Sequence, residues 1–172
     1  VTYQRDGVDE AISFSGVSKI DGRNPATGSD ADTVAGISGQ EWVLDFGGNL
    51  TTTGYTKLAN IENATGGNGT VNARALADQG YSLVNDSSAA LDNGYVRVSG
   101  ITFSDVSRVK ASTTGSSDNI TGANAATWTL KDLDSNGVAN NVNVQGIDFS
   151  GIDSVTATSA AITGSSLDDT FT

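Results

Sequence analysis

The chain has no cysteine, no histidine and no methionine among its 172 residues. Without cysteine it has no disulfide framework, no thiolate nucleophile and no cysteine-based zinc site. Without histidine it contains neither a Ser-His-Asp nor a Cys-His catalytic arrangement. No apolar run is long enough to span a membrane. These absences predict that the protein is not an enzyme and does not insert into a membrane.

Basic residues are also scarce. Nine Lys and Arg face twenty Asp and Glu, so the formal net charge is −11. A strongly negative protein is repelled by the phosphates of nucleic acids and of anionic lipids. The charge therefore predicts that nucleic acid is not a partner and that cations such as calcium are attracted.

The abundant residues are those of short strands and tight turns: Gly, Ser, Thr, Asn and Asp. Seventeen of the twenty acidic residues are Asp, which favours turns, whereas Glu favours helices. No stretch sustains a period of 3.6 residues, and the best helix candidate, residues 73–79, amounts to a single turn. The composition predicts an all-β fold.

The chain repeats itself. Four nine-residue segments match, each with an aromatic residue followed by aliphatic residues three and six positions later: residues 12–20, 53–61, 101–109 and 147–155. Their aromatic residues lie 41, 48 and 46 positions apart. A repeat of about 46 residues indicates an array in which each unit buries its apolar face against its neighbours.

A second series of aromatic residues lies between the first. Trp42, Tyr81 and Trp128 each come two residues before a leucine. Merging the two series places aromatic residues 21 to 26 positions apart, at Tyr55, Tyr81, Phe103, Trp128, Phe149 and Phe171. We interpret the chain as a parallel β-solenoid in which the repeat of about 46 residues forms two rungs of about 22 to 25.

This phasing predicts which side chains are buried. Phe103, Trp128 and Phe149 should be mostly buried in an aromatic ladder. The aliphatic residues at equivalent positions should also be buried in ladders: Val17, Ile20, Leu58, Ile61, Val106, Val109, Ile152 and Val155.

No linker interrupts the pattern, so residues 1–172 are predicted to form one domain, and the array is expected to continue beyond residue 172. The alternative is a tandem of two β-sandwiches. Each sandwich needs about seven strands and about 100 residues, so a repeat near 46 residues favours the solenoid.

Residues 132–137 (DLDSNG) are the strongest calcium candidate. Asp132, Asp134 and Asn136 have the alternate spacing that directs oxygens to one point in calcium loops. The carboxylate expected at position 12 of such a loop is replaced by Asn143. Residues 66–69 and 164–170 partly match the nonapeptide of calcium-binding β-rolls, but not in tandem. We therefore interpret these segments as turns and predict neither a metal nor another cofactor. A calcium-binding β-roll-like module remains an alternative.

Paired carboxylates are the catalysts of polysaccharide cleavage in many glycosidases. Asp168 and Asp169 are neighbours, so on a strand they would point to opposite faces. Asp148 and Asp153 are the other pair, and nothing accompanies them as a unique basic partner. We therefore predict no catalytic residue. A carbohydrate-binding or polysaccharide-processing β-solenoid remains an alternative, although only Tyr3, Phe46 and Tyr95 lie outside the ladder to form a sugar platform.

Three segments resemble the repeats of very large bacterial surface proteins: residues 61–67 (IENATGG), 103–122 and 149–172. These proteins are the filamentous-haemagglutinin-like adhesins and their β-strand-repeat relatives. Ala64 replaces the leucine of their N-L-T-G-G string, and the haemagglutinin secretion motif is absent. The resemblance implies a right-handed β-solenoid stalk that is exported to the cell surface for adhesion, biofilm or filament formation.

We therefore expect a non-catalytic structural or adhesive repeat module of a secreted protein on the bacterial cell surface. Its expected partners are neighbouring repeats of the same chain, further copies of itself, and a host-cell or glycan receptor.

Overall fold

The computed structural model describes residues 2–5, 8–11, 20–22, 31–36, 38–52, 55–84, 89–114, 117–122, 126–131 and 141–164. This part of the chain is all-β, as predicted, with seventeen strands and no helix. Residues 73–79, the helix candidate, form turns and bends.

The strands form two sheets. β1 (Thr2–Arg5) and β2 (Val8–Ala11) pair only with each other, as an antiparallel hairpin. The other fifteen strands form one open, mixed sheet. They are β3 (Ile20–Asp21), β4 (Thr33–Ala35), β5 (Glu41–Leu44), β6 (Leu50–Thr52), β7 (Tyr55–Ala59), β8 (Asn63–Asn72), β9 (Gly80–Ser82), β10 (Val96–Val98), β11 (Ile101–Lys110), β12 (Asn119–Thr121), β13 (Thr127–Lys131), β14 (Asn141–Val144), β15 (Ile147–Ser150), β16 (Ser154–Thr156) and β17 (Ala161–Thr163).

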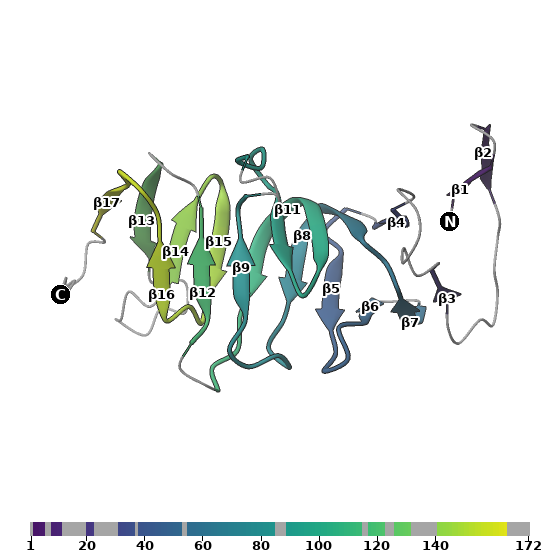
Figure 1. Cartoon of the computed structure of the whole chain (residues 1–172), viewed down its shortest axis with the longest axis horizontal. Coiled ribbons are helices and arrows are strands. Elements are labelled where there is room, and N and C mark those ends of the chain that lie inside the picture. The colour runs from purple at the N-terminus through teal and green to yellow at the C-terminus, as the bar shows by residue number, and fades with distance from the viewer. Residues whose placement is uncertain are drawn as a thin grey trace.

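Parallel pairing dominates the large sheet. Among the described strands, eight pairs are parallel and six are antiparallel. β3 lies toward one end of the long axis of the molecule, and β16 and β17 lie at the other (Figure 1). The chain thus advances along this axis as its strands are added.

Tight turns produce the antiparallel hairpins. β10 and β11 are joined by Ser99 and Gly100, with φ of 51° and 83°, and β14 and β15 by Gln145 and Gly146, with φ of 51° and 79°. Two central residues with positive φ define the type I′ turn, whose twist matches that of the strands. Glycine takes the second position because it adopts positive φ without steric cost.

A row of side chains that we call the central column runs through the parallel strands. Strands β5, β8, β11 and β15 place Trp42, Val71, Val109 and Phe149 side by side, and all four are fully buried. Because strand side chains alternate between faces, the preceding residue of each strand, such as Glu41 or Arg108, points away from the core. The column forms part of one continuous apolar core.

The predicted rung of 22 to 25 residues is wrong. Val71 pairs with Val109, 38 positions later, and Ile120 pairs with Val155, 35 positions later. The repeat of about 46 residues reflects the recurring hairpin instead. Phe103 and Phe149 each pair across an I′ hairpin with a valine, Val96 and Val142 respectively. The number of residues between successive hairpins therefore differs from the number of residues between parallel partners.

The aromatic residues are buried as predicted but do not stack on one another as a ladder. Phe103, Trp128 and Phe149 are at most 2% exposed. Their parallel neighbours are aliphatic: Phe103 lies beside Ala64, and Trp128 beside Ile162. In these parallel pairs an aromatic side chain therefore lies beside an aliphatic one.

The predicted aliphatic core is largely confirmed where it is described. Leu58, Val106 and Val109 are buried, while Ile61 and Ile152 are partly buried against the core. Val155 is 42% exposed, so its predicted burial is wrong. Ile20 pairs with Leu58 through the backbone, but its side chain lies outside the described part of the structure, as does Val17.

Candidate functional site at the end of the sheet

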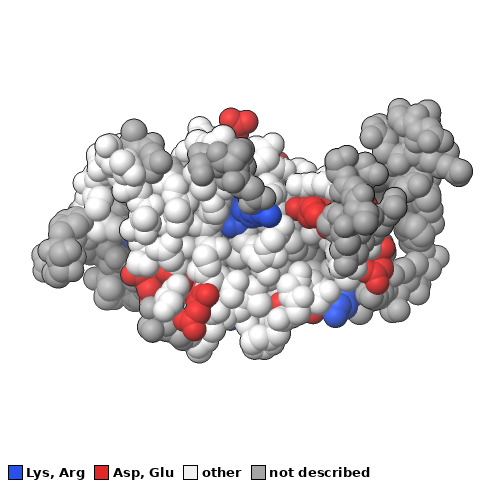
Figure 2. Space-filling view, viewed as in Figure 1, with Lys and Arg blue, Asp and Glu red and all other residues white. Residues whose placement is uncertain are grey.

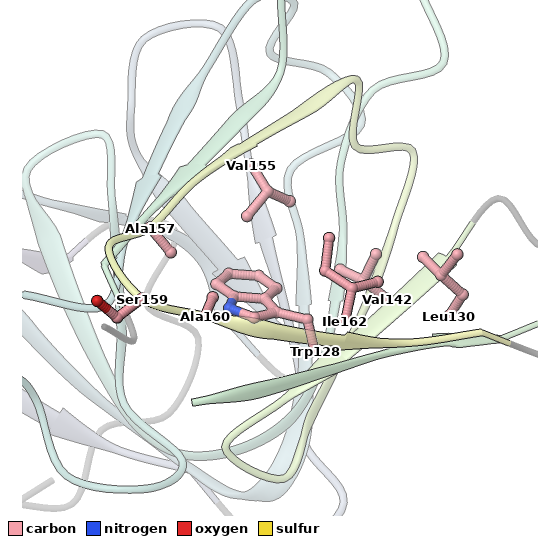
Figure 3. Close-up of a pocket in the computed structure, with 8 residues that line it drawn as sticks. All are labelled: Trp128, Leu130, Val142, Val155, Ala157, Ser159, Ala160 and Ile162. Carbon is pink, nitrogen blue, oxygen red and sulfur yellow. The ribbon is translucent and has the colours of Figure 1, made fainter. Parts of the chain in front are cut away.

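A cavity of about 330 Å³ opens where β16 and β17 end the sheet. Figure 3 shows the Trp128 indole at its centre, with Val155 and Ile162 beside it. None of the lining residues is charged, and Ser159 is the only polar residue besides the indole nitrogen of Trp128. The lining consists of Trp128, Leu130, Val142, Val155, Ala157, Ser159, Ala160 and Ile162.

The local sequence explains why apolar side chains line this cavity. Residues Ser154–Thr156 and Ala161–Thr163 each place one aliphatic residue between two smaller ones, so Val155 and Ile162 share a face. The intervening turn includes Ser159, at φ 55°. Together, these residues form an apolar wall around the Trp128 ring.

The cavity is the uncovered end of two rows of buried residues. Ile120 is fully buried because β12 has β9 on one side and β16 on the other. In the described structure, β16 pairs only with β12 and β17 only with β13. Val155 and Ile162 are therefore 42% and 60% exposed. Each Å² of this apolar surface that became buried would contribute roughly 25 cal/mol.

Trp128 itself is only 2% exposed, so its ring is not a platform for a sugar. Its indole nitrogen is buried and has no hydrogen-bond partner among the described residues. An unpaired buried donor costs about 1–3 kcal/mol. The lining offers apolar contact, one hydroxyl group from Ser159 and no charged side chain.

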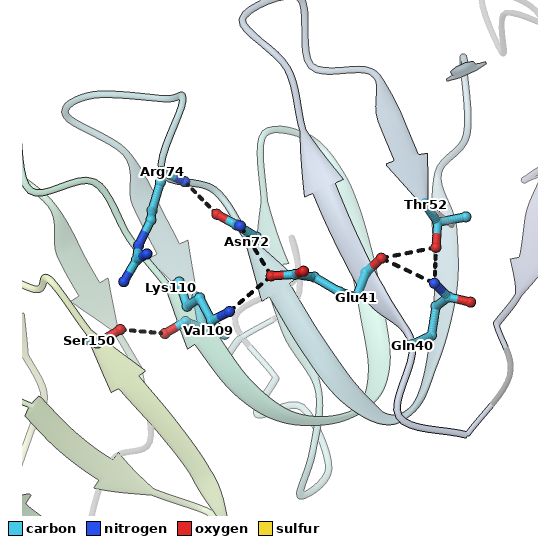
Figure 4. A network of polar contacts seen from close by, with 8 residues as sticks. All are labelled: Gln40, Glu41, Thr52, Asn72, Arg74, Val109, Lys110 and Ser150. Carbon is cyan, nitrogen blue, oxygen red and sulfur yellow. Dashed lines mark hydrogen bonds and ion pairs between the residues drawn. The ribbon is translucent and has the colours of Figure 1, made fainter. Parts of the chain in front are cut away.

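A polar network joins β5, β8 and β11 on the face of the sheet that points away from the core (Figure 4). Glu41 Oε1 accepts hydrogen bonds from Lys110 Nζ at 2.9 Å and from Asn72 Nδ2 at 3.1 Å. The hydrogen bond from Lys110 is the main cause of the lowered pKa of Glu41. Glu41 and Lys110 form an ion pair that links β5 to β11, and Asn72 of β8 joins the same carboxylate.

The backbone of the same region is held by two further side chains. Gln40 Nε2 and Thr52 Oγ1 both donate to the carbonyl oxygen of Glu41, at 3.2 and 2.9 Å. Gln40 and Thr52 are buried, and they also contact each other. These bonds position β5 beside β6.

Buried Asp118 belongs to a row of carboxylates that cap the starts of β9 and β12. Asp118 Oδ1 accepts the backbone N–H of Gln79 at 2.7 Å, and Asp153 Oδ2 accepts that of Asp118 at 2.9 Å. Burial chiefly raises the pKa of Asp118, and the nearby charges of Asp153 and Asp78 raise it further. The row replaces lost water contacts of the backbone at these strand starts.

The candidate acid pair Asp148 and Asp153 is divided between two structural roles. Asp148 Oδ1 accepts hydrogen bonds from Lys131 Nζ at 2.8 Å and Asn143 Nδ2 at 2.7 Å, whereas Asp153 caps Asp118. Asp168 and Asp169 lie outside the described residues. Asp148 and Asp153 therefore have different partners and do not act as a pair.

Some of the calcium candidates lie outside the described structure and others lie within a strand. Asp132, Asp134 and Asn136 lie outside the described residues. Residues 66–69, interpreted as a turn, lie within β8, where Gly69 packs against the backbone of Gln40, just before β5. Among the residues that the structure places, no group of three acidic side chains could hold a metal ion.

Phe46 is the most exposed large apolar side chain in the described structure, at 86%. It lies in the turn between β5 and β6, far along the molecule from β16 and β17 (Figure 1). Sequence reasoning noted Phe46 only as an aromatic residue outside the ladder. It missed the cavity, because no local pattern distinguishes Val155 from the buried Ile120.

On the face shown in Figure 2, the few basic side chains stand beside acidic ones and form no continuous basic patch. The described chain also has no helix that is long and apolar enough to cross a bilayer.

Comparisons with protein-family models, curated proteins and solved structures gave no match. The arguments for function therefore rest on the geometry of this chain.

Proposed function

We propose that the protein is a non-catalytic structural or adhesive module of a secreted bacterial surface protein, built as a segment of a right-handed parallel β-solenoid. The central column carries this proposal. Segments 29 to 40 positions apart each contribute one strand and one fully buried apolar side chain to the same row, from Trp42 to Phe149. Stacking of this kind produces length and surface.

Strand pairing along the column makes the segment stiff. Neighbouring strands are spaced about 4.8 Å apart, and each strand of the column hydrogen-bonds to the next. Pulling along the stack loads many backbone hydrogen bonds and a continuous apolar core. Such a segment acts as a stiff spacer or as part of a filament in adhesion or biofilm formation.

Two acidic groups that could act in catalysis are paired with lysines in the described structure. Glu41 is paired with Lys110, and Asp148 with Lys131. No charged group lines the cavity. The proposed partners are neighbouring repeats, other copies and a host-cell or glycan receptor, with neither nucleic acid nor membrane insertion involved.

Immunogold electron microscopy of intact cells that produce the full-length protein tests location, with lysed cells as the permeability control. We expect label on intact cells at the outer surface. Label seen only after lysis would reject a surface role.

A glycan array with the purified chain tests the carbohydrate alternative. We expect no oligosaccharide to bind at micromolar concentration, because the aromatic ring of the cavity is covered. Micromolar binding of a defined oligosaccharide would replace the spacer by a carbohydrate-binding module.

A further inference from the structure

A four-residue sequence pattern recurs where parallel strands begin. Its first residue is Asp, Glu or Gln, its second is small, its third is apolar, and its fourth is Ser or Thr in all but one copy. The copies are residues 32–35 (DTVA), 62–65 (ENAT), 79–82 (QGYS), 118–121 (DNIT) and 153–156 (DSVT). Strands β4, β8, β9, β12 and β16 each begin at the second residue. The third residue is buried in every copy except the last, where Val155 is exposed.

The first residue of the pattern links a strand to its parallel neighbour. The backbone N–H of Asp32 donates to Glu62 Oε2 at 2.9 Å. In the same way, the N–H of Gln79 donates to Asp118 Oδ1 at 2.7 Å, and the N–H of Asp118 donates to Asp153 Oδ2 at 2.9 Å. Hydrogen bonds to an ionised carboxylate are roughly twice as strong as neutral ones. An acidic residue at this position therefore favours one register of the incoming strand.

The backbone bonds differ between a covered and an uncovered copy of the pattern. The N–H of Asp118 is directed to the carboxylate on the next strand, and Asn119 donates to the Gln79 carbonyl at 3.0 Å. Asp153 and Ser154 instead both donate to the Asp118 carbonyl, at 2.9 and 3.1 Å. The N–H of Asp153 is therefore placed to donate to a carboxylate on a further strand, as the N–H of Asp118 does.

The outer edge of β16 is open in the described structure, where β12 is its single strand partner. Ser154 donates to the carbonyl of Asp118, and Gly122 donates to that of Thr156. The side of β16 that faces β12 thus uses residues 154 and 156. Because a parallel strand bonds to its two neighbours through alternate residues, the N–H and C=O of Val155 face the open edge.

We propose that this edge binds one further parallel strand, supplied by a neighbouring repeat, with the sequence acid–small–aliphatic–Ser/Thr. Its carboxylate accepts the N–H of Asp153, its aliphatic side chain covers Val155, and its backbone pairs with that of Val155. The occupant follows from continuity with the interface between β12 and β16, which is built from the same contacts. In strand addition the main chain provides affinity and alternate side chains provide specificity. This inference rests on the proposed structural role and names the sequence that a neighbouring repeat needs.

Hydrogen exchange of a chain that carries its own test strand measures the binding. A copy of residues 117–122 (SDNITG) is appended after Thr172 through a flexible Gly/Ser linker, which gives an effective concentration on the order of millimolar. We expect the Val155 amide to exchange about tenfold more slowly than in the unextended chain, as for a concentration about ten times the dissociation constant. The methyl NMR signals of Val155 should shift as well.

Substitutions within the appended copy test the sequence requirement and leave the chain's own strands unchanged. Asp118→Ala removes the carboxylate, and Ile120→Lys removes the aliphatic side chain. Each should return the exchange of the Val155 amide to the rate in the unextended chain. Asn119→Ser is the matched control, because residues 153–156 carry Ser at this position, and it should keep the protection.

Three results would overturn the inference. The first is unchanged exchange of the Val155 amide in the fusion, and the second is protection that survives both Asp118→Ala and Ile120→Lys. The third is a Val155 amide that is already protected in the unextended chain. In that case the chain itself occupies the edge or, if protection rises with protein concentration, a second copy does. The immunogold result is independent of all three, so the strand contact and the surface role fail separately.

Discussion

At the scale of single residues, burial separates side chains of the same type. Phe149 is fully buried in the central column, and Phe46 is 86% exposed. The two therefore form a matched pair in which the same substitution has different costs.

We predict that Phe149→Ala lowers the free energy of unfolding by about 3–5 kcal/mol, because it leaves a cavity beside Val109. Phe46→Ala should change it by less than about 0.5 kcal/mol. Urea denaturation followed by fluorescence measures both. Equal midpoints for the two variants would mean that Phe149 is not a core residue.

Asp118 predicts a pH dependence of stability. Burial raises its pKa in the folded state, so the folded protein holds this proton more tightly than the unfolded chain. The stability contributed by Asp118 is therefore largest below the ordinary pKa of a carboxyl group and falls as pH rises through the raised pKa.

Asp118→Asn keeps an oxygen acceptor for the N–H of Gln79 and removes the buried charge. We expect the variant to gain stability over wild type at pH 7, with the gain diminishing toward pH 3. Asp118→Leu removes the acceptor and should cost about 1–3 kcal/mol. Urea titrations at both pH values provide the test, and an Asn variant less stable than wild type at pH 7 would contradict it.

At the scale of elements, close approach between strand segments depends on glycines such as Gly69. A Cβ on Gly69 would collide with the backbone oxygen of Gln40, which accepts the N–H of Thr70 at 2.9 Å. A Cβ added to Gly80 in β9 would meet no other atom within 4 Å.

Gly69→Ala should therefore destabilise the protein by about 1–3 kcal/mol, because it forces β5 and β8 apart. Gly80→Ala should change stability by less than about 1 kcal/mol. Thermal melts of both variants make the comparison. A Gly69→Ala variant as stable as Gly80→Ala would show that β5 does not pack closely on β8.

The ion pair between Glu41 and Lys110 joins β5 to β11 across β8. Its side chains are 43% and 25% exposed, so solvent screens the attraction. We predict that Lys110→Met costs about 0.2–1 kcal/mol at pH 7 in low salt and less in 1 M salt.

The pKa of Glu41 is lowered in the folded state, so the ion pair contributes above the ordinary carboxyl pKa and is lost as pH falls through the lowered value. Denaturation of wild type and Lys110→Met should therefore converge at acidic pH. A difference that persists at pH 2 would assign the loss to packing of the lysine stem instead.

At the scale of the whole molecule, the acidic sequence attracts cations without a described site to hold them. Among the described residues no acidic group has the geometry of a metal site. We predict that the melting temperature in millimolar calcium and in chelator differs by less than about 5 °C. A larger rise with calcium, absent with magnesium, would revive the calcium-binding alternative and direct attention to Asp132 and Asp134.

Local chemistry was sufficient for the fold class and for part of the core. Turn-forming residues, scarce helix formers and spaced apolar residues predict an all-β chain because these preferences act within a few residues of each other. The burial of Phe103, Trp128 and Phe149 is also predictable from local chemistry, because large aromatic side chains dominate the energetics of a core.

The register between distant strands was not predictable from the repeat. Phe103 and Phe149 match because both close an I′ hairpin, yet Phe149 packs beside Val109 in the parallel ladder. Hairpin turns are short-range, whereas parallel pairing joins segments 29 to 40 positions apart. The length of the intervening chain is not constrained by the repeated motif.

The candidate site belongs entirely to the tertiary structure. Val155 has the same local pattern as the buried Ile120, and it is exposed because no described strand lies beyond β16. Burial of a residue in a stack depends on the strands on both sides of it. Sequence alone therefore identifies which side chains can join an apolar row, and only the three-dimensional arrangement determines where that row ends and leaves a surface open for a partner.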